Sequence, residues 1–300
     1  MDNAAIVLAG ATGNLGGRIA RALRERDAHV RAIVRRPSAP DRLEALRKLG
    51  VAIVEVDFSS FDALAAACSG ASCVISALAG LRDVIVHTQA LLLDAAVTAG
   101  VPRFIPSDFS IDFTKLPPGT NRNLDLRREF HEHLDKAPIS KTSILNGMFT
   151  ELLTGPAPVL LFRWKRVVYW EDPDQPLDFT TIDNTAEFTA SAALDPATPR
   201  FLRIAGDQIS ARGLAEVASQ VTGEKFRLFR AGGLTSLATL IKVTRAVLPQ
   251  RGALYPPWQG MQYLHNMFSG RAKLAPLDNH RYPGIRWTTV REVLATRSPR

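Results

Sequence analysis

The chain has 300 residues, of which 46% are apolar and 22% charged. This length suits one large domain or two modest ones, and the composition excludes a disordered chain, a collagen-like fibre and a disulfide-stapled miniprotein. The net charge of +8 is compatible with an anionic partner, such as nucleic acid, a membrane surface or a small molecule, and equally with a plain excess of arginine.

In the first half of the chain, short apolar runs alternate with helical patterns, which is typical of a parallel sheet covered by helices. Helices are predicted over residues 61–68, 84–99 and 123–135. Strands are predicted over residues 4–9, 29–34, 52–56, 73–77, 103–106 and 142–146. The pattern indicates an α/β protein with a Rossmann-type, doubly wound parallel sheet.

The rhythm changes from about residue 149, where the predicted strands shorten and prolines become frequent. We therefore expect two domains. Residues 1–148 would form the Rossmann-type domain, and residues 149–300 a smaller α/β lobe.

A glycine-rich loop, Gly10-Ala11-Thr12-Gly13-Asn14-Leu15-Gly16, follows the first predicted strand and precedes a helical pattern. Glycines allow a sharp turn and a close approach to a ligand, and a helix N-terminus favours a phosphate group. The spacing is G-x-x-G-x-x-G, and a turn that serves only helix–strand packing remains the alternative. Its place on the first strand–turn–helix of the chain favours a dinucleotide site.

The second predicted strand ends in Arg35 and Arg36, and no carboxylate follows until Asp41. NAD sites usually place an acidic residue here for the ribose 2′-hydroxyl, whereas an arginine accommodates a 2′-phosphate. Two solvated arginines on an exposed loop are the alternative interpretation. The pattern favours NADP(H) as the cofactor.

At this point the chain resembles the NmrA-like and isoflavone-reductase-like group of atypical short-chain dehydrogenases. The resemblance covers nearly the whole length and rests on the glycine loop, Arg35, Asp57-Phe58, Pro106-Ser107-Asp108-Phe109, the stretch 144–149 and the stretch 177–183. It implies cofactor contacts from the loop and from the ends of later strands. These positions are Gly10, Thr12, Gly13, Asn14, Leu15, Gly16, Arg35, Arg36, Asp57, Phe58, Ala77, Leu78, Pro106, Ser107, Asp108 and Phe109.

The sequence departs from the family at the catalytic position. No tyrosine stands in a Tyr-x-x-x-Lys context, and the lysine that the reductase branch carries three residues before Ile-Arg-Arg corresponds to Asn123. Asparagine can orient a carbonyl or a water but cannot deliver a proton. Arg127 follows one helical turn later and would stabilise negative charge on a substrate oxygen, or else lie on the surface. Among the large apolar residues, Met148, Phe149 and Trp258 are candidate substrate contacts.

Two functions remain open. The first is an NADPH-dependent reductase of a small, largely uncharged molecule such as a carbonyl, an enone or a benzylic ether. The second is a non-catalytic NADP(H) sensor that binds a protein partner. We expect no metal and no membrane segment, and nucleic acid is a weaker explanation of the charge. The two cysteines, Cys68 and Cys73, fit a reducing compartment, so a cytoplasmic location is expected.

Overall fold

The computed structural model describes residues 4–155 and 157–296. The fold divides into two compact units that interleave along the chain. Unit 1 takes the described residues of Met1–Phe109, Leu126–Ile144 and Thr185–Leu202, and unit 2 takes those of Ser110–Asp125, Leu145–Asn184 and Arg203–Arg300. That cofactor and substrate functions divide at residue 148 stays a prediction.

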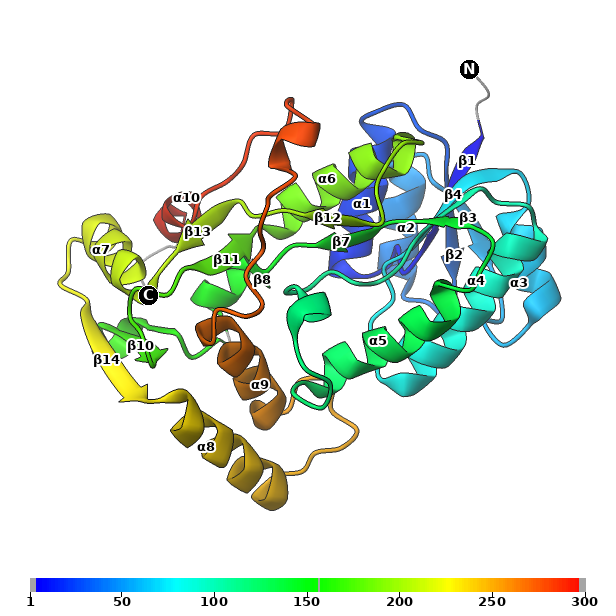
Figure 1. The fold of residues 1–300 in the computed structure, drawn as a ribbon. Helices are drawn as coiled ribbons and strands as arrows, with labels where there is room; N and C mark the ends of the chain where they lie inside the picture. Colours follow the sequence, from blue (N-terminus) through cyan, green and yellow to red (C-terminus); the bar gives the residue numbers. More distant parts are fainter. Residues whose placement is uncertain (1–3, 156, 297–300) are drawn as a thin grey trace. The chain divides into compact units, whose positions relative to one another are not determined.

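Unit 1 is built on a six-stranded sheet in the order β3-β2-β1-β4-β5-β6 (Figure 1). Every neighbouring pair is parallel. The strands are β1 (Ala5–Ala9), β2 (Val30–Val34), β3 (Ala52–Glu55), β4 (Ala71–Ser76), β5 (Arg103–Ile105) and β6 (Ser140–Lys141). This is the Rossmann-type order, so the predicted fold class is confirmed. The order reverses between β1 and β4, where such sheets bind ligands beyond the carboxyl ends of the strands.

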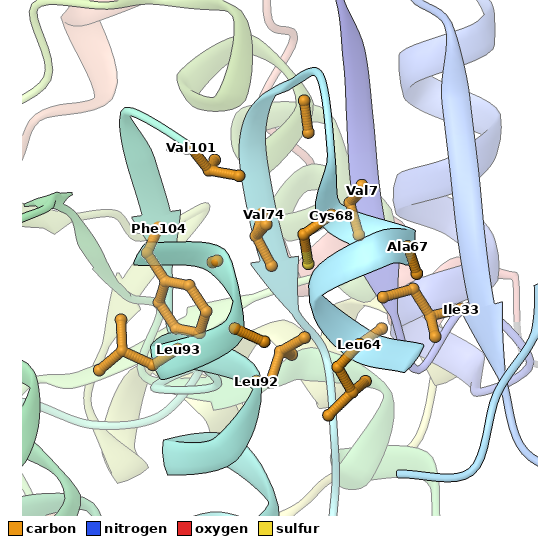
Figure 2. Packing of buried hydrophobic residues seen from close by; sticks show 14 of the residues in the cluster. Val7, Ile33, Leu64, Ala67, Cys68, Val74, Leu92, Leu93, Val101 and Phe104 are labelled. Carbon is orange, nitrogen blue, oxygen red and sulfur yellow. The ribbon is translucent and has the colours of Figure 1, made fainter. Parts of the chain in front are cut away.

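The helices bury an apolar layer against this sheet. In Figure 2, Leu64 and Cys68 from one helix and Leu92 from another pack against Val74 and Phe104 of the strands, and none of the five side chains is exposed to solvent. Burial of such side chains is the main stabilising contribution to a domain of this kind. The helices that follow strands β1 to β5 are α1 (Asn14–Arg24), α2 (Pro40–Lys48), α3 (Phe61–Cys68), α4 (Gln89–Thr98) and α5 (Arg122–Leu134), with a π-helical turn, η1 (Asp83–Thr88), before α4. Most of α5, and most of α6 (Ile182–Leu194), which follows a strand of unit 2, belongs to unit 1.

The stretch over residues 142–146, predicted as the sixth strand of the main sheet, does not pair with that sheet as a whole. The sixth strand of the main sheet lies just before it, at β6, and ends where the Thr142 amide donates to the Phe104 carbonyl at 3.1 Å. Residues Ser143–Leu145 form β7, which pairs with β12 (Phe201–Arg203) in a separate two-stranded sheet. The neighbouring β5 ends at Ile105 because Pro106 has no amide hydrogen to extend the ladder.

Unit 2 contains two three-stranded sheets, β14-β10-β9 and β13-β11-β8. As the sequence predicts, the strands here are short. They are β8 (Met148–Phe149), β9 (Leu160–Leu161), β10 (Arg166–Trp170), β11 (Leu177–Thr180), β13 (Asp207–Ile209) and β14 (Arg227–Gly232). The helices are α7 (Ala211–Thr222), α8 (Leu234–Val247), α9 (Pro257–Phe268) and α10 (Val290–Ala295), with short 3₁₀ turns η2 (Phe113–Lys115), η3 (Thr150–Thr154), η4 (Phe162–Trp164) and η5 (Asn279–Arg281).

Residues 4–155 and 157–296 contain neither a membrane-spanning helix nor a candidate metal cluster. No helix in these ranges is both long and apolar enough to cross a bilayer. The same ranges hold no cluster of three or more His, Cys, Asp or Glu side chains placed to bind a metal ion.

Candidate functional site

The glycine loop connects β1 to α1 and closes tightly on its surroundings. Gly10 has a φ of +88°, and a Cβ on it would lie 2.5 Å from the Ala77 carbonyl oxygen. A Cβ on Gly16 would lie 2.1 Å from the Gly10 carbonyl oxygen. Backbone packing therefore requires glycine at both positions. At Gly13 the corresponding distance is 3.2 Å, which is tight but less severe.

The N-terminus of α1 is suited to an anion. Gly13 is the N-cap and supplies no side-chain cap, and no acidic residue lies in the first turn. Gly13 and Asn14 are exposed, while Thr12 and Leu15 are partly buried. The Asn14 Oδ1 accepts a hydrogen bond from Arg18 Nε at 3.1 Å. The first amides of the helix and the positive end of its dipole therefore face a position without a competing carboxylate.

The two arginines after β2 differ in their surroundings. Arg36 forms an ion pair with Glu55, which ends β3. The exposed guanidinium of Arg35 has no hydrogen-bond or ion-pair partner among the described residues. A third arginine, Arg42, was not selected by the sequence analysis; its Nη1 donates to the Thr12 carbonyl of the glycine loop at 2.7 Å. Arg35 is therefore the arginine open to a phosphate, and Arg42 adds positive charge beside the loop.

The pair Asp57-Phe58 follows β3, at the same edge of the parallel sheet as the glycine loop after β1 and Arg35 after β2. Asp57 Oδ1 accepts hydrogen bonds from the Ser59 amide at 2.9 Å and the Ser59 hydroxyl at 2.7 Å. These two bonds lower the pKa of the Asp57 carboxyl below its usual value, and the bond from the Ser59 amide has the larger effect. Phe58 packs partly buried against the apolar core. Both residues thus shape the turn that follows β3.

The ends of β1, β4 and β5 are joined by hydrogen bonds. The Ala77 amide donates to the Ala9 carbonyl at 2.8 Å. The Ser107 hydroxyl donates to the Leu78 carbonyl at 2.6 Å, and the Ser107 amide donates to Gln89 Oε1 at 2.9 Å. The segments 77–78 and 106–109 therefore lie together at the carboxyl edge of the sheet, with 77–78 packed against Gly10. That these residues contact a cofactor stays a prediction.

Asp108, one residue further on, is fully buried and charged. Its Oδ2 lies 2.7 Å from His131 Nε2 and accepts a hydrogen bond from the Ser143 hydroxyl at 2.5 Å. Arg200 donates to Ser143 Oγ at 2.6 Å and contacts His131 Nδ1 at 3.1 Å. The flanking Pro106 and Phe109 are also buried.

The pKa of Asp108 follows from these contacts. Burial acts to raise the pKa, but His131, Ser143 and the charge of Arg127 together outweigh burial and leave the pKa below the ordinary 3.8. A carboxyl whose pKa is lowered on folding contributes stability above its unfolded-state pKa. That contribution is fully present near neutral pH and is lost as pH falls through the lower pKa of the folded state.

The predicted catalytic residues lie on α5 and have different surroundings. In unit 2, Asn123 is 2% exposed, its Nδ2 donates to the Leu254 carbonyl at 3.0 Å, and its Oδ1 accepts from Arg122 Nε at 3.0 Å. In unit 1, Arg127 is partly buried and places its charge near Asp108. Asn123 is thus held in one orientation by two hydrogen bonds.

The three candidate substrate residues all belong to unit 2. Met148 and Phe149 form β8 and are both partly exposed. Trp258 is 2% exposed, its indole N–H donates to the Pro249 carbonyl at 3.0 Å, and the Arg122 guanidinium lies 4.7 Å from its ring centroid. In this structure Trp258 packs inside unit 2, whereas Met148 and Phe149 keep accessible surface.

Comparison with known proteins gives a consistent family match. Residues 2–251 match the sequence model of the NmrA-like family. Pinoresinol reductase 1 of Arabidopsis thaliana is 30% identical over 209 residues, which are 64% of this chain and 65% of that protein. The match thus spans slightly less than two thirds of that relative.

Solved structures share the fold over almost the full chain. A structure described as AtPrR2 with NADP+ and (+)pinoresinol has a TM-score of 0.83 and 21% identity, covering 98% of this chain and 99% of its own. The binary complex of leucoanthocyanidin reductase and NADPH from Vitis vinifera has a TM-score of 0.81 and 18% identity, covering 96% and 97%. At these identities the likeness shows the fold alone.

Proposed function

We propose that this chain, which belongs to the NmrA-like family, is an NADPH-dependent reductase of a small, largely uncharged organic molecule. It is distantly related to pinoresinol reductases, and proteins of the same fold hold NADP+ or NADPH. The observation that carries the proposal is the cationic edge of the sheet. The uncapped N-terminus of α1 follows β1 and is suited to a pyrophosphate, and the unpartnered Arg35 follows the neighbouring β2 and is suited to a 2′-phosphate.

The residues present fit the cofactor. A Cβ at Gly10 or Gly16 would collide with neighbouring backbone, so glycine is needed at both positions for the tight connection between β1 and α1, which we propose is the loop that cradles the pyrophosphate. Because the Gly13 amide already donates to the Gly10 carbonyl at 2.9 Å, Asn14 and Leu15 would present their amides to the pyrophosphate. Arg35 would bind the 2′-phosphate with two parallel hydrogen bonds. When bound, NADPH supplies the hydride. The segments 77–78 and 106–109 would border its nicotinamide end.

Asn123 stands where the reductase branch carries a lysine, so other side chains would have to act on the substrate. Arg127 would stabilise negative charge that develops on a substrate oxygen, and Asn123 would orient that oxygen or a water. Met148 and Phe149, which keep accessible surface, would contact an apolar substrate, whereas Trp258 is buried within unit 2 and would support them only indirectly. Carbonyls, enones and benzylic ethers are the substrate types that such a site suits.

The alternative is an NADP(H) sensor that binds a protein partner. It is favoured by one observation, namely that both polar groups of Asn123 are engaged, by Leu254 and by Arg122. A side chain held in this way, without a titratable proton, provides no proton donor. A sensor would need only binding, with cofactor occupancy shifting the population of a partner-binding surface.

NADPH oxidation across a panel of ketones, enones and phenolic benzylic ethers, run beside an NADPH titration of the same protein, tests the proposal. A reductase is expected to bind NADPH and oxidise it with at least one class of compound. Tight NADPH binding without oxidation by any member of the panel would contradict the reductase and leave the sensor. Absence of NADPH binding would overturn both.

A further inference from the structure

Exposed apolar side chains concentrate on α8 and on the loop that follows it, in unit 2. The described residues include eight large apolar side chains that are exposed, and five of them lie between residues 240 and 255. They are Leu240, Val243, Val247, Leu248 and Tyr255, with exposed fractions from 46% to 71%. The first three are spaced three and four residues apart, so they line one face of the helix. We call these five residues the α8 surface, and an apolar patch of this kind marks a site of interaction.

The α8 surface is a fixed part of unit 2 that leaves one side of the helix uncovered within that unit. Of the 14 residues of α8, only Leu237 is buried. The helix follows β14, an edge strand, and packs mainly against α9 (Figure 1). The loop after α8 is held by Arg122, whose Nη2 donates to the carbonyls of Ala253 and Leu254 at 3.0 and 2.8 Å. The open side of α8 therefore belongs to a defined structure.

The segment that contains the α8 surface carries positive charge only. Residues 225–256 hold six basic side chains, all exposed, and no Asp or Glu. The six are Lys225, Arg227, Arg230, Lys242, Arg245 and Arg251. None of these side chains has a hydrogen-bond or ion-pair partner among the described residues, although the Arg245 guanidinium lies 5.1 Å from the ring centroid of Trp258. Glu171 accepts the Leu234 amide at 3.0 Å, at the end of α8 opposite to Val247. Cations without a neutralising carboxylate therefore accompany the apolar stripe.

The charge distinguishes between the partners that an apolar surface can bind. A symmetric contact between two copies through α8 would bring two sets of these cations together, and like charges repel each other. An anionic bilayer is complementary in both respects. Its headgroups attract Lys and Arg, and the apolar residues of a helix that lies in the interface enter the boundary with the acyl chains. The exposed ring of Tyr255 suits the headgroup level, where tyrosine is enriched.

We propose that the α8 surface binds an anionic lipid bilayer, with α8 lying in the plane of the interface. Val243 and Val247 enter the apolar boundary, and Lys242 and Arg251 contact the lipid headgroups. The attachment is peripheral and crosses no membrane. It goes beyond the proposed reductase activity and does not depend on it.

Co-sedimentation of the full chain with lipid vesicles tests the proposal. The vesicles are phosphatidylcholine alone, or phosphatidylcholine with about one third phosphatidylglycerol, whose headgroup is anionic. Two double variants separate the contributions. Val243→Ser/Val247→Ser removes apolar surface and keeps the charge, whereas Lys242→Gln/Arg251→Gln removes two charges and keeps the apolar side chains. All four positions are exposed, and thermal unfolding checks that both variants are folded.

Wild-type protein is expected to bind the anionic vesicles and to bind the phosphatidylcholine vesicles at least roughly tenfold more weakly. Val243→Ser/Val247→Ser should bind the anionic vesicles roughly tenfold more weakly than wild type, because less apolar surface enters the boundary. Lys242→Gln/Arg251→Gln should lose roughly thirtyfold at low salt. That loss should shrink at about 0.5 M salt, since screening also removes the attraction that wild type has.

The matched control is Arg21→Gln/Lys48→Gln, which removes two exposed cations from α1 and α2 of unit 1. Its affinity for the anionic vesicles should stay within about threefold of wild type, because these charges lie outside the proposed contact. An equal loss in the control, no loss in Val243→Ser/Val247→Ser, or no binding of wild type to anionic vesicles would overturn the inference.

Two further measurements identify the other possible occupants of the α8 surface. Light scattering that shows a dimer in wild type and a monomer in Val243→Ser/Val247→Ser would assign the surface to a second copy and contradict the proposal. Binding to polyglutamate without binding to anionic vesicles would assign it to an acidic protein and contradict the proposal equally. We expect neither result.

Discussion

Single basic residues in this protein satisfy backbone carbonyls at helix ends. Arg103 on β5 is 8% exposed and donates to the carbonyls of Ala192 at 2.8 Å and Ala193 at 3.0 Å, and to Thr198 Oγ1 at 2.7 Å. The last turn of a helix leaves such carbonyls without partners. Arg103 therefore acts as a side-chain cap for the end of α6.

We expect Arg103→Leu to lower the free energy of unfolding by about 2–4 kcal/mol, because it leaves several buried acceptors without donors. Urea unfolding followed by circular dichroism measures the change. Arg21→Ala, an exposed position on α1, is the control and should stay within about 0.5 kcal/mol of wild type. A loss at Arg103 no larger than that of the control would contradict the capping role.

Residues that act through local spacing were predictable from the sequence, and residues that act through long-range contacts were not. The glycine loop and Arg35 stand at fixed offsets from a strand, so the sequence indicates their place. Asp108 and His131 are 23 positions apart, and His131 and Arg200 are 69 apart. No local pattern connects them, since only the packing of α5 beside β5 and β12 brings them together.

At the scale of elements, two helical glycines differ in whether the structure has room for a side chain at their positions. Gly16 in α1 has no room for a side chain, because a Cβ would lie 2.1 Å from the Gly10 carbonyl oxygen. Gly260 in α9 is exposed and has no atom within 4 Å of its would-be Cβ. The first glycine allows the loop to close on the helix, and the second only lowers helix propensity.

We predict that Gly16→Ala abolishes NADP+ binding and lowers stability, whereas Gly260→Ala raises stability by about 0.5–1 kcal/mol and leaves binding unchanged. Thermal unfolding and an NADP+ titration of both variants measure these effects. Unaltered NADP+ binding by Gly16→Ala would show that the loop does not form the proposed cradle.

The parallel sheet was more predictable than unit 2, for a physical reason. Strands β1, β2, β4 and β5 are largely buried apolar runs, and β3 is a partly buried one; turns and helices separate them, so each carries its own signal. The division between β6 and β7 depends on β5 ending at Ile105, before Pro106, which no property of residues 140–145 reveals. In unit 2, strands such as β8 and β9 have two residues each, too few to show a period.

At the scale of the whole molecule, several of the basic side chains form hydrogen bonds within the protein. Arg24, Arg26, Arg31 and Arg42 donate to backbone carbonyls near the ends of helices and in the glycine loop. Lys141 likewise donates to the carbonyls of residues 134, 135 and 137. These five cations therefore have a structural role that requires no polyanionic partner. Arg35 differs from them because its guanidinium faces solvent beside the proposed phosphate site.

The relative affinity for NADPH and NADH, measured in wild type, Arg35→Ala and Arg36→Ala, tests the central claim most directly. Wild type should prefer NADPH. Arg35→Ala should weaken NADPH binding roughly ten- to a hundredfold, the effect of losing a charge-assisted contact, and should leave NADH binding nearly unchanged. Arg36→Ala should have a smaller effect, because Arg36 is paired with Glu55. Equal losses for both dinucleotides in Arg35→Ala, or a wild-type preference for NADH, would contradict the account.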